Sequence, residues 1–299
     1  MTQAFPPIID VDWLGSHRCH VVVCDVRWYL DGRSGRDAYA AGHLPGAVFV
    51  DLDTWLAGPA TPAEGRHPLP RPDVFAEGMQ RAGIANGATV VAYDDGGATA
   101  ARLVWLLRTC GEPAALLDGG LAATDEPLSV VAPVVVPGSF RLGAWPDAGT
   151  ADADEVAHAV ASGGVVIDAR NPQRYDGTTE PVDPRAGHVP GALNVPFAGN
   201  LDADGRFLDP PALRARYAAV GADATPAIVY CGSGVTACHD LLAIEHAGLP
   251  AARLYPGSWS QWSADPARPV ATGGGDASAG SSAGPDHRRS PRDPAGTTH

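Results

Sequence analysis

Lysine is absent from this sequence of 299 residues, so arginine carries every fixed positive charge. The 21 basic residues are outnumbered by 34 acidic ones, and the formal net charge is -13. This balance argues against nucleic acid as a partner, because binding phosphates requires a basic face. An anionic substrate would have to be held by arginine, histidine, hydroxyl groups or backbone amides.

Long apolar runs are also lacking. No stretch is long enough to cross a bilayer, and residues 1–12 have neither the basic leader nor the hydrophobic core of a signal peptide. The five cysteines are an odd number and show no C-x-x-C pairing of the kind that binds metals. Such a set is typical of reduced thiols rather than of a disulfide framework. We therefore expect a cytoplasmic protein without a membrane partner.

One cysteine occupies a special position. Cys231 follows the apolar run 227–230 and opens the loop Cys231-Gly232-Ser233-Gly234-Val235-Thr236, after which helical periodicity begins. A strand, a glycine-bearing turn and a helix in this order direct backbone N–H groups and the positive end of a helix dipole toward the sulfur. The glycines would let the loop curl around a charged sulfur species. The alternative is a small, buried apolar residue, and the surroundings of the thiol decide between the two.

The chain contains an internal repeat. The matching segments pair 22–27 with 165–170, 42–47 with 187–192, and 90–94 with 227–231. Each copy alternates short β-branched runs with amphipathic stretches, the pattern of an α/β domain whose mainly parallel sheet is flanked by helices. The sequence therefore predicts a duplicated α/β domain.

The two copies differ at the cysteine position, where the first copy has Asp94. Only the second copy can use a thiol there, and the first would complete a cleft at the domain interface. The predicted boundaries are an inactive N-terminal domain over 1–124, a linker over 125–147, a catalytic domain over 148–270 and a disordered tail over 271–299.

Together these motifs resemble the tandem-domain rhodaneses, the sulfurtransferase family that includes thiosulfate sulfurtransferase and 3-mercaptopyruvate sulfurtransferase. The resemblance extends from Ile8 to Trp262 and includes both Gly-His-x-Pro-Gly motifs, the cysteine loop and the segment 257–262. It implies two tandem rhodanese-like domains, each with a five-stranded parallel sheet, and an active site in the second domain that faces the interface.

The resemblance also implies a reaction. Sulfane sulfur would move from thiosulfate or 3-mercaptopyruvate to cyanide, a thiol or thioredoxin through a persulfide on Cys231, with no metal or organic cofactor. Backbone amides of residues 232–236 would stabilise the thiolate and the persulfide, as an oxyanion hole stabilises oxygen.

The evidence on the preferred donor conflicts. The loop is that of mercaptopyruvate enzymes, whereas animal thiosulfate enzymes place basic residues after the cysteine. Arg174 matches an arginine that both subtypes present to substrate. The mercaptopyruvate pattern continues Glu-Pro-Arg, however, and this chain has Glu180-Pro181-Val182. The second carboxylate-binding arginine is missing from its place, and Arg185 is a candidate substitute.

In mercaptopyruvate enzymes, a first-domain histidine lies near the loop serine and relays a proton, with an aspartate behind it. The matching residues here are Ser233 and His43, and the aspartate would be Asp37 or Asp31. Alternatively, His43 is a turn residue of the repeat, as we expect for His188.

Residues of the loop and of the helix that follows it have further expected roles, and two of them, Thr236 and Cys238, have an alternative. The hydroxyls of Ser233 and Thr236 would donate hydrogen bonds to sulfur or to the leaving group, but Thr236 could instead cap the helix that follows. Cys238 is expected to be buried, with a resolving thiol as the alternative. The Asp-x-Arg sequences at 25–27 and 168–170 occur in both copies and are therefore expected to be structural ion pairs.

Two other functions compete with sulfur transfer. A phosphatase of the same fold would need the pattern Cys-x5-Arg, and the loop here is followed by Ala237. A non-catalytic binding module that docks a sulfur carrier is the second alternative, and the intact cysteine loop argues against it.

Overall fold

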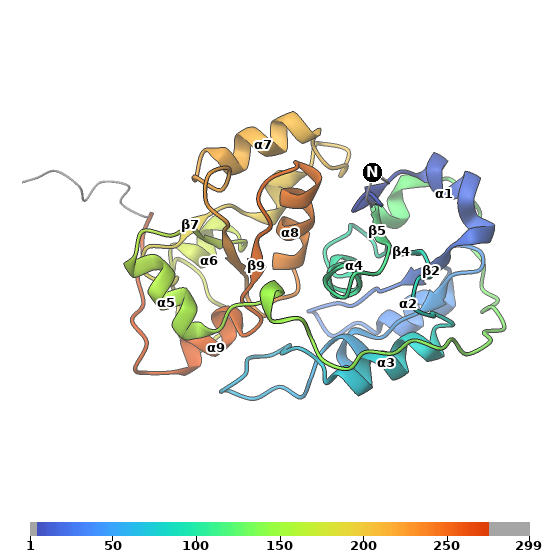
Figure 1. The fold of residues 1–299 in the computed structure, drawn as a ribbon, viewed down its shortest axis with the longest axis horizontal. Helices are drawn as coiled ribbons and strands as arrows, with labels where there is room; N and C mark the ends of the chain where they lie inside the picture. The colour runs from blue at the N-terminus through green and yellow to red at the C-terminus, as the bar shows by residue number, and fades with distance from the viewer. Residues whose placement is uncertain (1–4, 275–299) are drawn as a thin grey trace, which may run out of the picture.

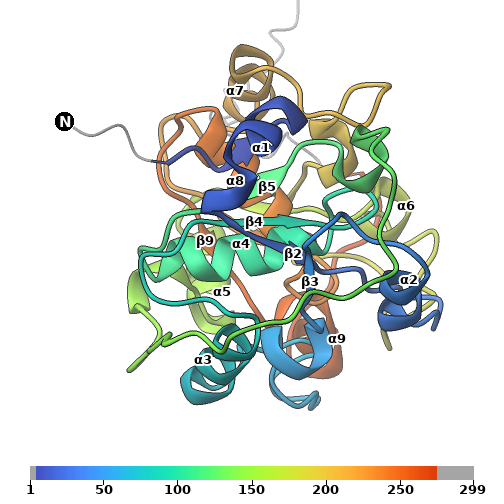
Figure 2. The same cartoon turned by 90° about the vertical axis from the view of Figure 1, so that its right-hand side faces the viewer.

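The computed structural model describes residues 5–274, which form two α/β domains, each built around a parallel sheet (Figure 1). This confirms the predicted fold class. Turned by 90°, the molecule shows the N-terminal sheet with α4 beside β4 (Figure 2). No helix within residues 5–274 is long and apolar enough to span a membrane.

The N-terminal domain has a five-stranded sheet in the order β1-β5-β4-β2-β3, with every pairing parallel. Its strands are β1 (Ile8–Ile9), β2 (Val22–Asp25), β3 (Val48–Phe49), β4 (Val90–Tyr93) and β5 (Ala114–Leu117). Its helices are α1 (Val11–His17), α2 (Gly35–Ala41), α3 (Pro72–Arg81) and α4 (Ala100–Thr109). All residues of β4 and β5 are buried, as expected for central strands covered on both faces.

The C-terminal domain has a four-stranded parallel sheet in the order β7-β6-β8-β9. Its strands are β6 (Val166–Asp168), β7 (Leu193–Asn194), β8 (Ile228–Tyr230) and β9 (Arg253–Leu254). Its helices are α5 (Ala153–Ala161), α6 (Pro172–Tyr175), α7 (Pro210–Ala218), α8 (Ala237–His246) and α9 (Ser258–Ala264).

The expectation of five strands in this second sheet is wrong. At the fifth position a single parallel bridge joins Thr150 to Leu254, and the Ala151 amide donates to the Leu254 carbonyl at 2.8 Å. The chain has no room to continue as a strand, because Asp152 caps α5 immediately afterwards by accepting from the Glu155 amide.

The Asp-x-Arg sequences form the predicted structural ion pairs. Arg27 binds Asp25 at 2.7 Å and donates to the Gly42 carbonyl at 2.6 Å. The second domain repeats this arrangement, since Arg170 binds Asp168 at 2.6 Å and donates to the Gly187 carbonyl at 2.6 Å. In both copies the arginine ties the Gly-His-x-Pro-Gly turn to the end of a central strand.

Between the short helical turns Gly120–Ala123 and Asp147–Gly149 lies a segment without helices or strands, which overlaps the linker predicted over 125–147. The predicted tail over 271–299 lies largely outside the described residues. Its first residue, Ala271, exchanges backbone hydrogen bonds with His188, so the ordered chain extends past 270.

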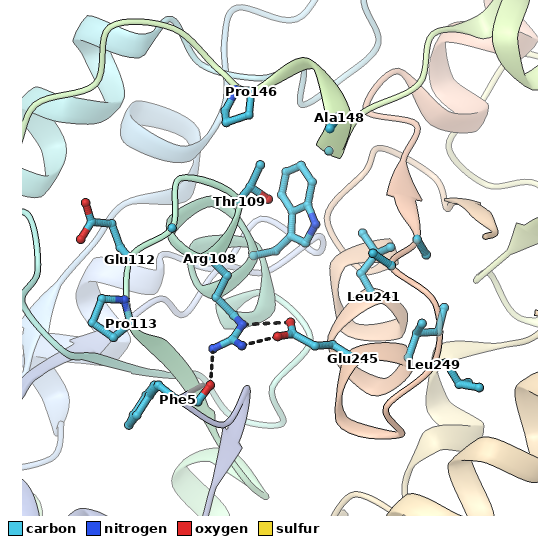
Figure 3. Close-up of a pocket in the computed structure, with 16 residues that line it drawn as sticks. Phe5, Arg108, Thr109, Glu112, Pro113, Pro146, Ala148, Leu241, Glu245 and Leu249 are labelled. Carbon is cyan, nitrogen blue, oxygen red and sulfur yellow. Dashed lines mark hydrogen bonds and ion pairs between the residues drawn. The ribbon is translucent and has the colours of Figure 1, made fainter. Parts of the chain in front are cut away.

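The two domains meet along α4 and α8, the helices that follow corresponding strands of the repeat (Figure 1). At one end of this contact Arg108 forms an ion pair with Glu245, and its Nε donates to Glu245 Oε2 at 2.9 Å (Figure 3). A cavity of about 610 Å³ opens there between Trp105 and Leu241, and no residue of the 231–236 loop lines it. Because α4 and α8 pack side by side, the loops that precede them both face the interface.

Candidate active site

Cys231 lies directly after β8, and the loop that it opens leads into α8. Its side chain is 2% exposed, and the amide of Gly234 donates to Cys231 Sγ over 3.1 Å. The sulfur is therefore buried within the turn and accepts from the Gly234 amide.

The first turn of α9 fixes the orientation of this loop. The amides of Trp259 and Ser260 donate to the carbonyls of Cys231 and Gly232, both at 2.9 Å. The N–H groups at the start of a helix have no partners within the helix, so they are available for these carbonyls. Because C=O and N–H point in opposite directions across a planar peptide, fixing the carbonyls toward α9 turns the following amides toward the inside of the loop.

The two glycines of the loop are required for different reasons. Gly234 has a φ of +77°, and a Cβ there would lie 2.6 Å from the Pro256 carbonyl oxygen. Gly232 does not have a left-handed φ, and glycine is required there because its surroundings leave no space for a side chain. A Cβ on Gly232 would lie 3.0 Å from Arg66 Nη2 and 3.3 Å from Arg174 Nη1.

Replacing Gly234 by alanine is expected to lower the free energy of unfolding by about 2–4 kcal/mol, because left-handed backbone and a clash with a carbonyl add together. The matched control is Gly205→Ala, where φ is +74° and nothing lies within 4 Å of the added methyl. Urea unfolding of the two variants separates the cost of a left-handed backbone, which both share, from the cost of the clash with Pro256. Equal destabilisation would show that the contact with Pro256 is unimportant.

The corresponding loop of the N-terminal domain is filled by its own carboxylate. Asp94 Oδ2 accepts from the Thr99 amide at 2.6 Å, the Thr99 hydroxyl at 2.6 Å and the Ala100 amide at 2.7 Å. Asp94 Oδ1 accepts from the amides of Gly96 and Gly97. This loop geometry therefore surrounds an anion with donors.

In the C-terminal domain the residue that matches Thr99 is Thr236. It makes no side-chain capping bond to α8, unlike the capping role considered for it. Its hydroxyl remains available to a group bound at Cys231.

A histidine from the N-terminal domain reaches the loop serine. His67 Nδ1 lies 2.8 Å from Ser233 Oγ, and His67 Nε2 lies 3.4 Å from Asp53 Oδ1. The other oxygen of Asp53 accepts from Trp28 Nε1 at 2.9 Å. Because a carboxylate accepts only, Nε2 carries the proton and Nδ1 accepts from the serine hydroxyl.

The structure does not bring His43 to Ser233. His43 stacks on Tyr39 with ring centroids 3.9 Å apart, and its Nδ1 lies 2.8 Å from the Tyr39 carbonyl. His188 does the same with Tyr175, at 3.7 Å and 2.7 Å. This shared packing accounts for the histidine in both Gly-His-x-Pro-Gly motifs.

The two aspartates considered behind His43 are likewise remote from this relay. Asp37 lies in the exposed first turn of α2, and Asp31 pairs with Arg33 at 2.9 Å on the surface. The relevant histidine and aspartate, His67 and Asp53, were missed because they lie outside the repeated motifs. The available signal was a histidine in the proline-rich segment 66–70 without a counterpart in the second copy.

Of the two arginines predicted to bind substrate, only Arg174 lies beside the cysteine loop, next to Gly232. Arg185 is fully engaged elsewhere, since its guanidinium donates to four backbone carbonyls. These belong to Trp262, Ser263, Asp265 and Arg268. Arg185 therefore fastens the end of α9 and does not replace the missing arginine.

A buried arginine joins the two halves of the site. Arg102, on α4, is 0% exposed and donates to the Gly234 carbonyl at 3.0 Å and to the His67 carbonyl at 3.2 Å. It thereby fixes the cysteine loop relative to the segment that carries the histidine. Cys238 Sγ donates to the same Gly234 carbonyl at 3.3 Å.

Burial raises the pKa of the Cys238 thiol to about 12, so this thiol stays protonated at neutral pH. The arrangement agrees with a packing role for Cys238 rather than with a resolving thiol. Within residues 5–274, no group of three or more histidine, cysteine or acidic side chains is arranged to hold a metal ion.

Comparison with known proteins places these observations in context. Residues 12–126 and 152–265 match the family described as the rhodanese-like domain. A Pseudomonas aeruginosa protein named "Probable 3-mercaptopyruvate sulfurtransferase" is 44% identical, over 85% of this chain and 93% of its own length. A Mycobacterium tuberculosis relative, provisionally named thiosulfate sulfurtransferase SseB, is 42% identical over 85% of this chain and 91% of its own length.

Among solved structures, the crystal structure of SseA from Escherichia coli, described as a 3-mercaptopyruvate sulfurtransferase, is similar over 85% of this chain and 99% of that chain. The TM-score is 0.75 and the sequence identity 33%. The names of these relatives include both sulfur donors.

Proposed function

Because this chain belongs to the rhodanese family, as a tandem-domain sulfurtransferase of the 3-mercaptopyruvate and thiosulfate type, we propose that Cys231 is the nucleophile that carries the sulfur. The thiolate attacks the outer sulfur of the donor, and the bond from that sulfur to the rest of the donor breaks. Its electron pair leaves with sulfite or with the enolate of pyruvate, and a persulfide remains. An acceptor then attacks the outer sulfur and releases the thiolate, which gives ping-pong kinetics.

The observation that carries this proposal is the pair of matching loops. In the first copy, a carboxylate on Asp94 is bound by five N–H and O–H donors. A persulfide extends its outer sulfur one bond beyond the first, as a carboxylate extends its oxygens beyond its carbon. By position in the repeat, these donors match the amides of Ser233, Gly234, Thr236 and Ala237 and the hydroxyl of Thr236, and we therefore assign stabilisation of the persulfide to them.

The relay of Ser233, His67 and Asp53 supports 3-mercaptopyruvate as the better donor. This donor brings a thiol proton, which must leave the transferred sulfur and end on the carbon of the enolate. Neutral His67 accepts that proton through Ser233 and returns it, and Asp53 holds the imidazole in the required tautomer. When thiosulfate is the donor, the leaving group is sulfite, which departs without a proton transfer.

Arg174 is proposed to hold the anionic end of the donor through its guanidinium. On the acceptor side, the 2% exposure of Cys231 favours a small nucleophile, such as cyanide or a low-molecular-weight thiol, over thioredoxin.

All five cysteines are free, as expected for a reducing compartment, and a cytoplasmic location stays a prediction.

The test is the initial rate of thiocyanate formation with cyanide and each donor. We expect parallel double-reciprocal plots and a higher kcat/KM with 3-mercaptopyruvate than with thiosulfate. No thiocyanate above background with either donor would favour the non-catalytic docking module instead.

The pH dependence should report the state of His67. Burial lowers the pKa of His67 from its usual 6.5 to about 4, with Asp53 opposing this shift. Below that pH the imidazole is protonated and unable to accept, so kcat with 3-mercaptopyruvate should persist through pH 6.5 and fall near pH 4. A pH profile of kcat measures this. A limb near pH 6.5 that disappears in His67→Gln would contradict it.

A further inference from the structure

Two guanidinium groups from different domains meet at Gly232. Arg174 comes from α6 of the C-terminal domain, and Arg66 comes from the segment before α3 of the N-terminal domain. A Cβ on Gly232 would lie 3.0 Å from Arg66 Nη2 and 3.3 Å from Arg174 Nη1. Both groups therefore lie beside the residue that follows the nucleophile.

A buried carboxylate allows these like charges to lie together. Asp183, whose side chain is 2% exposed, pairs with Arg66 through one oxygen and with Arg174 Nη2 at 2.8 Å through the other. Arg174 also binds Glu180 at 2.7 Å. Asp183 thereby offsets the repulsion between the two arginines.

The guanidinium edges that face the loop lack acceptors. Arg66 Nε is buried without a hydrogen-bond partner, and no acceptor within residues 5–274 binds Arg66 Nη2 or Arg174 Nη1. Leaving the buried Arg66 Nε unpaired is costly, whereas the rest of this side chain, which is 28% exposed, is open to a ligand that accepts from it. An anion seated beside Gly232 would fill this role.

Arg66 is held in place before any ligand arrives. Its amide donates to Ser260 Oγ at 3.0 Å, on the α9 turn that also orients the cysteine loop. The preceding Gly65 has a φ of +90°, and a Cβ there would lie 2.6 Å from the Gly257 carbonyl oxygen. This close approach fastens the first-domain segment to the second domain and reduces the ordering needed on binding.

We propose that Arg66 supplies, from the N-terminal domain, the second guanidinium that the sequence Glu180-Pro181-Val182 lacks. Arg66 and Arg174 together bind the carboxylate or sulfonate end of the sulfur donor. This inference rests on the proposed function and identifies its substrate-binding residues.

The charges of the ion-pair chain indicate which anion fits. Three arginines alternate with three carboxylates in the order Asp168, Arg170, Glu180, Arg174, Asp183 and Arg66. The chain is formally neutral before substrate binds. A single negative charge, as on the carboxylate of 3-mercaptopyruvate, therefore disturbs it less than the two charges of thiosulfate.

The first test compares alkylation of Cys231 by iodoacetate, which has a carboxylate, and by neutral iodoacetamide. The ratio of the two rate constants should fall about 10-fold or more in Arg66→Gln, since charge-assisted hydrogen bonds are lost. The control is Arg71→Gln, whose side chain is 77% exposed and pairs with the neighbouring Asp73. A ratio unchanged in both variants would overturn the proposal.

The second test uses turnover. KM for 3-mercaptopyruvate should rise about 10- to 100-fold in Arg66→Gln with kcat within a few fold, because the anion contributes to binding before the reaction. Arg66→Lys should be intermediate, since it retains charge but loses the planar fork. If both arginines bind one anion, adding Arg174→Gln should cost less than the sum of the single changes.

These outcomes separate the inference from the function on which it rests. If the wild type turns over its donor but Arg66→Gln has the same alkylation ratio and KM as Arg71→Gln, only the role of Arg66 is overturned. Absent turnover in the wild type, with the alkylation ratio still dependent on Arg66, would overturn the function and leave the anion site standing. Thermal melting establishes that each variant is folded, and Arg66→Lys carries both tests if Arg66→Gln does not fold.

Discussion

Replacing Cys231 by alanine is expected to abolish sulfur transfer from both donors, with a loss of about 10⁴-fold or more, as when the nucleophile of a covalent mechanism is removed. The fold should survive, because the loop is held by its carbonyls through the Trp259 and Ser260 amides rather than by the sulfur. Thiocyanate formation with cyanide as acceptor measures the loss.

The matched control is Cys19→Ser, which changes an exposed cysteine of the N-terminal domain. Its activity should equal that of the wild type. Residual turnover in Cys231→Ala above about one hundredth of the wild-type rate would show that another group carries the sulfur, since that loss is far smaller than removal of a nucleophile produces.

The second large effect is expected at His67 and should depend on the donor. His67→Gln should lower kcat with 3-mercaptopyruvate by about 10²-fold, the usual contribution of a positioned acid or base. With thiosulfate the loss should stay below about 5-fold, because sulfite departs without the proton transfer that this residue supports. Parallel kcat measurements with the two donors give the ratio.

The comparison variant is His43→Gln. His43 is buried against Tyr39 and remote from Ser233, so its replacement should reduce stability without changing the ratio of kcat between donors. If His67→Gln impairs both donors equally, His67 serves to position the loop and the relay is not part of the reaction.

The residue that we propose as the nucleophile could be predicted from the order of elements along the chain. Cys231 stands where a buried strand gives way to a helix, and that sequence of elements fixes the loop amides without help from distant residues. The repeat was equally informative, because its matching segments became corresponding strands and its Asp-x-Arg pairs became the same ion pairs in both sheets. The cysteine loop and the ion pairs could be predicted because they depend on residues that are close together in the sequence.

The rest of the site depends on contacts between domains. His67 and Arg66 lie on a segment with no helical or strand periodicity, and contacts between the domains hold that segment beside the loop, among them Gly65 against Gly257 and Arg102 against the His67 carbonyl. Nothing in the spacing of residues along the chain encodes those contacts. His43 was favoured instead because the family resemblance assigned the relay to its position, whereas its repetition in both copies reflects shared packing on a tyrosine.

The loop of the N-terminal domain that corresponds to the cysteine loop is occupied by its own side chain. Asp94 satisfies the donors of its own loop, so the first domain stays folded around a fixed negative charge. Its α4 then supplies Arg102 to the Gly234 carbonyl of the active loop. The N-terminal domain thus contributes Arg102, His67 and Arg66 to the candidate site around Cys231.

Mass spectrometry of the full-length protein, treated with 3-mercaptopyruvate in the absence of an acceptor, tests the central claim most directly. The account predicts one added sulfur atom, located on the peptide that contains Cys231 and removed by cyanide. An unmodified Cys231 peptide, or sulfur found on Cys19, Cys110 or another thiol instead, would contradict it.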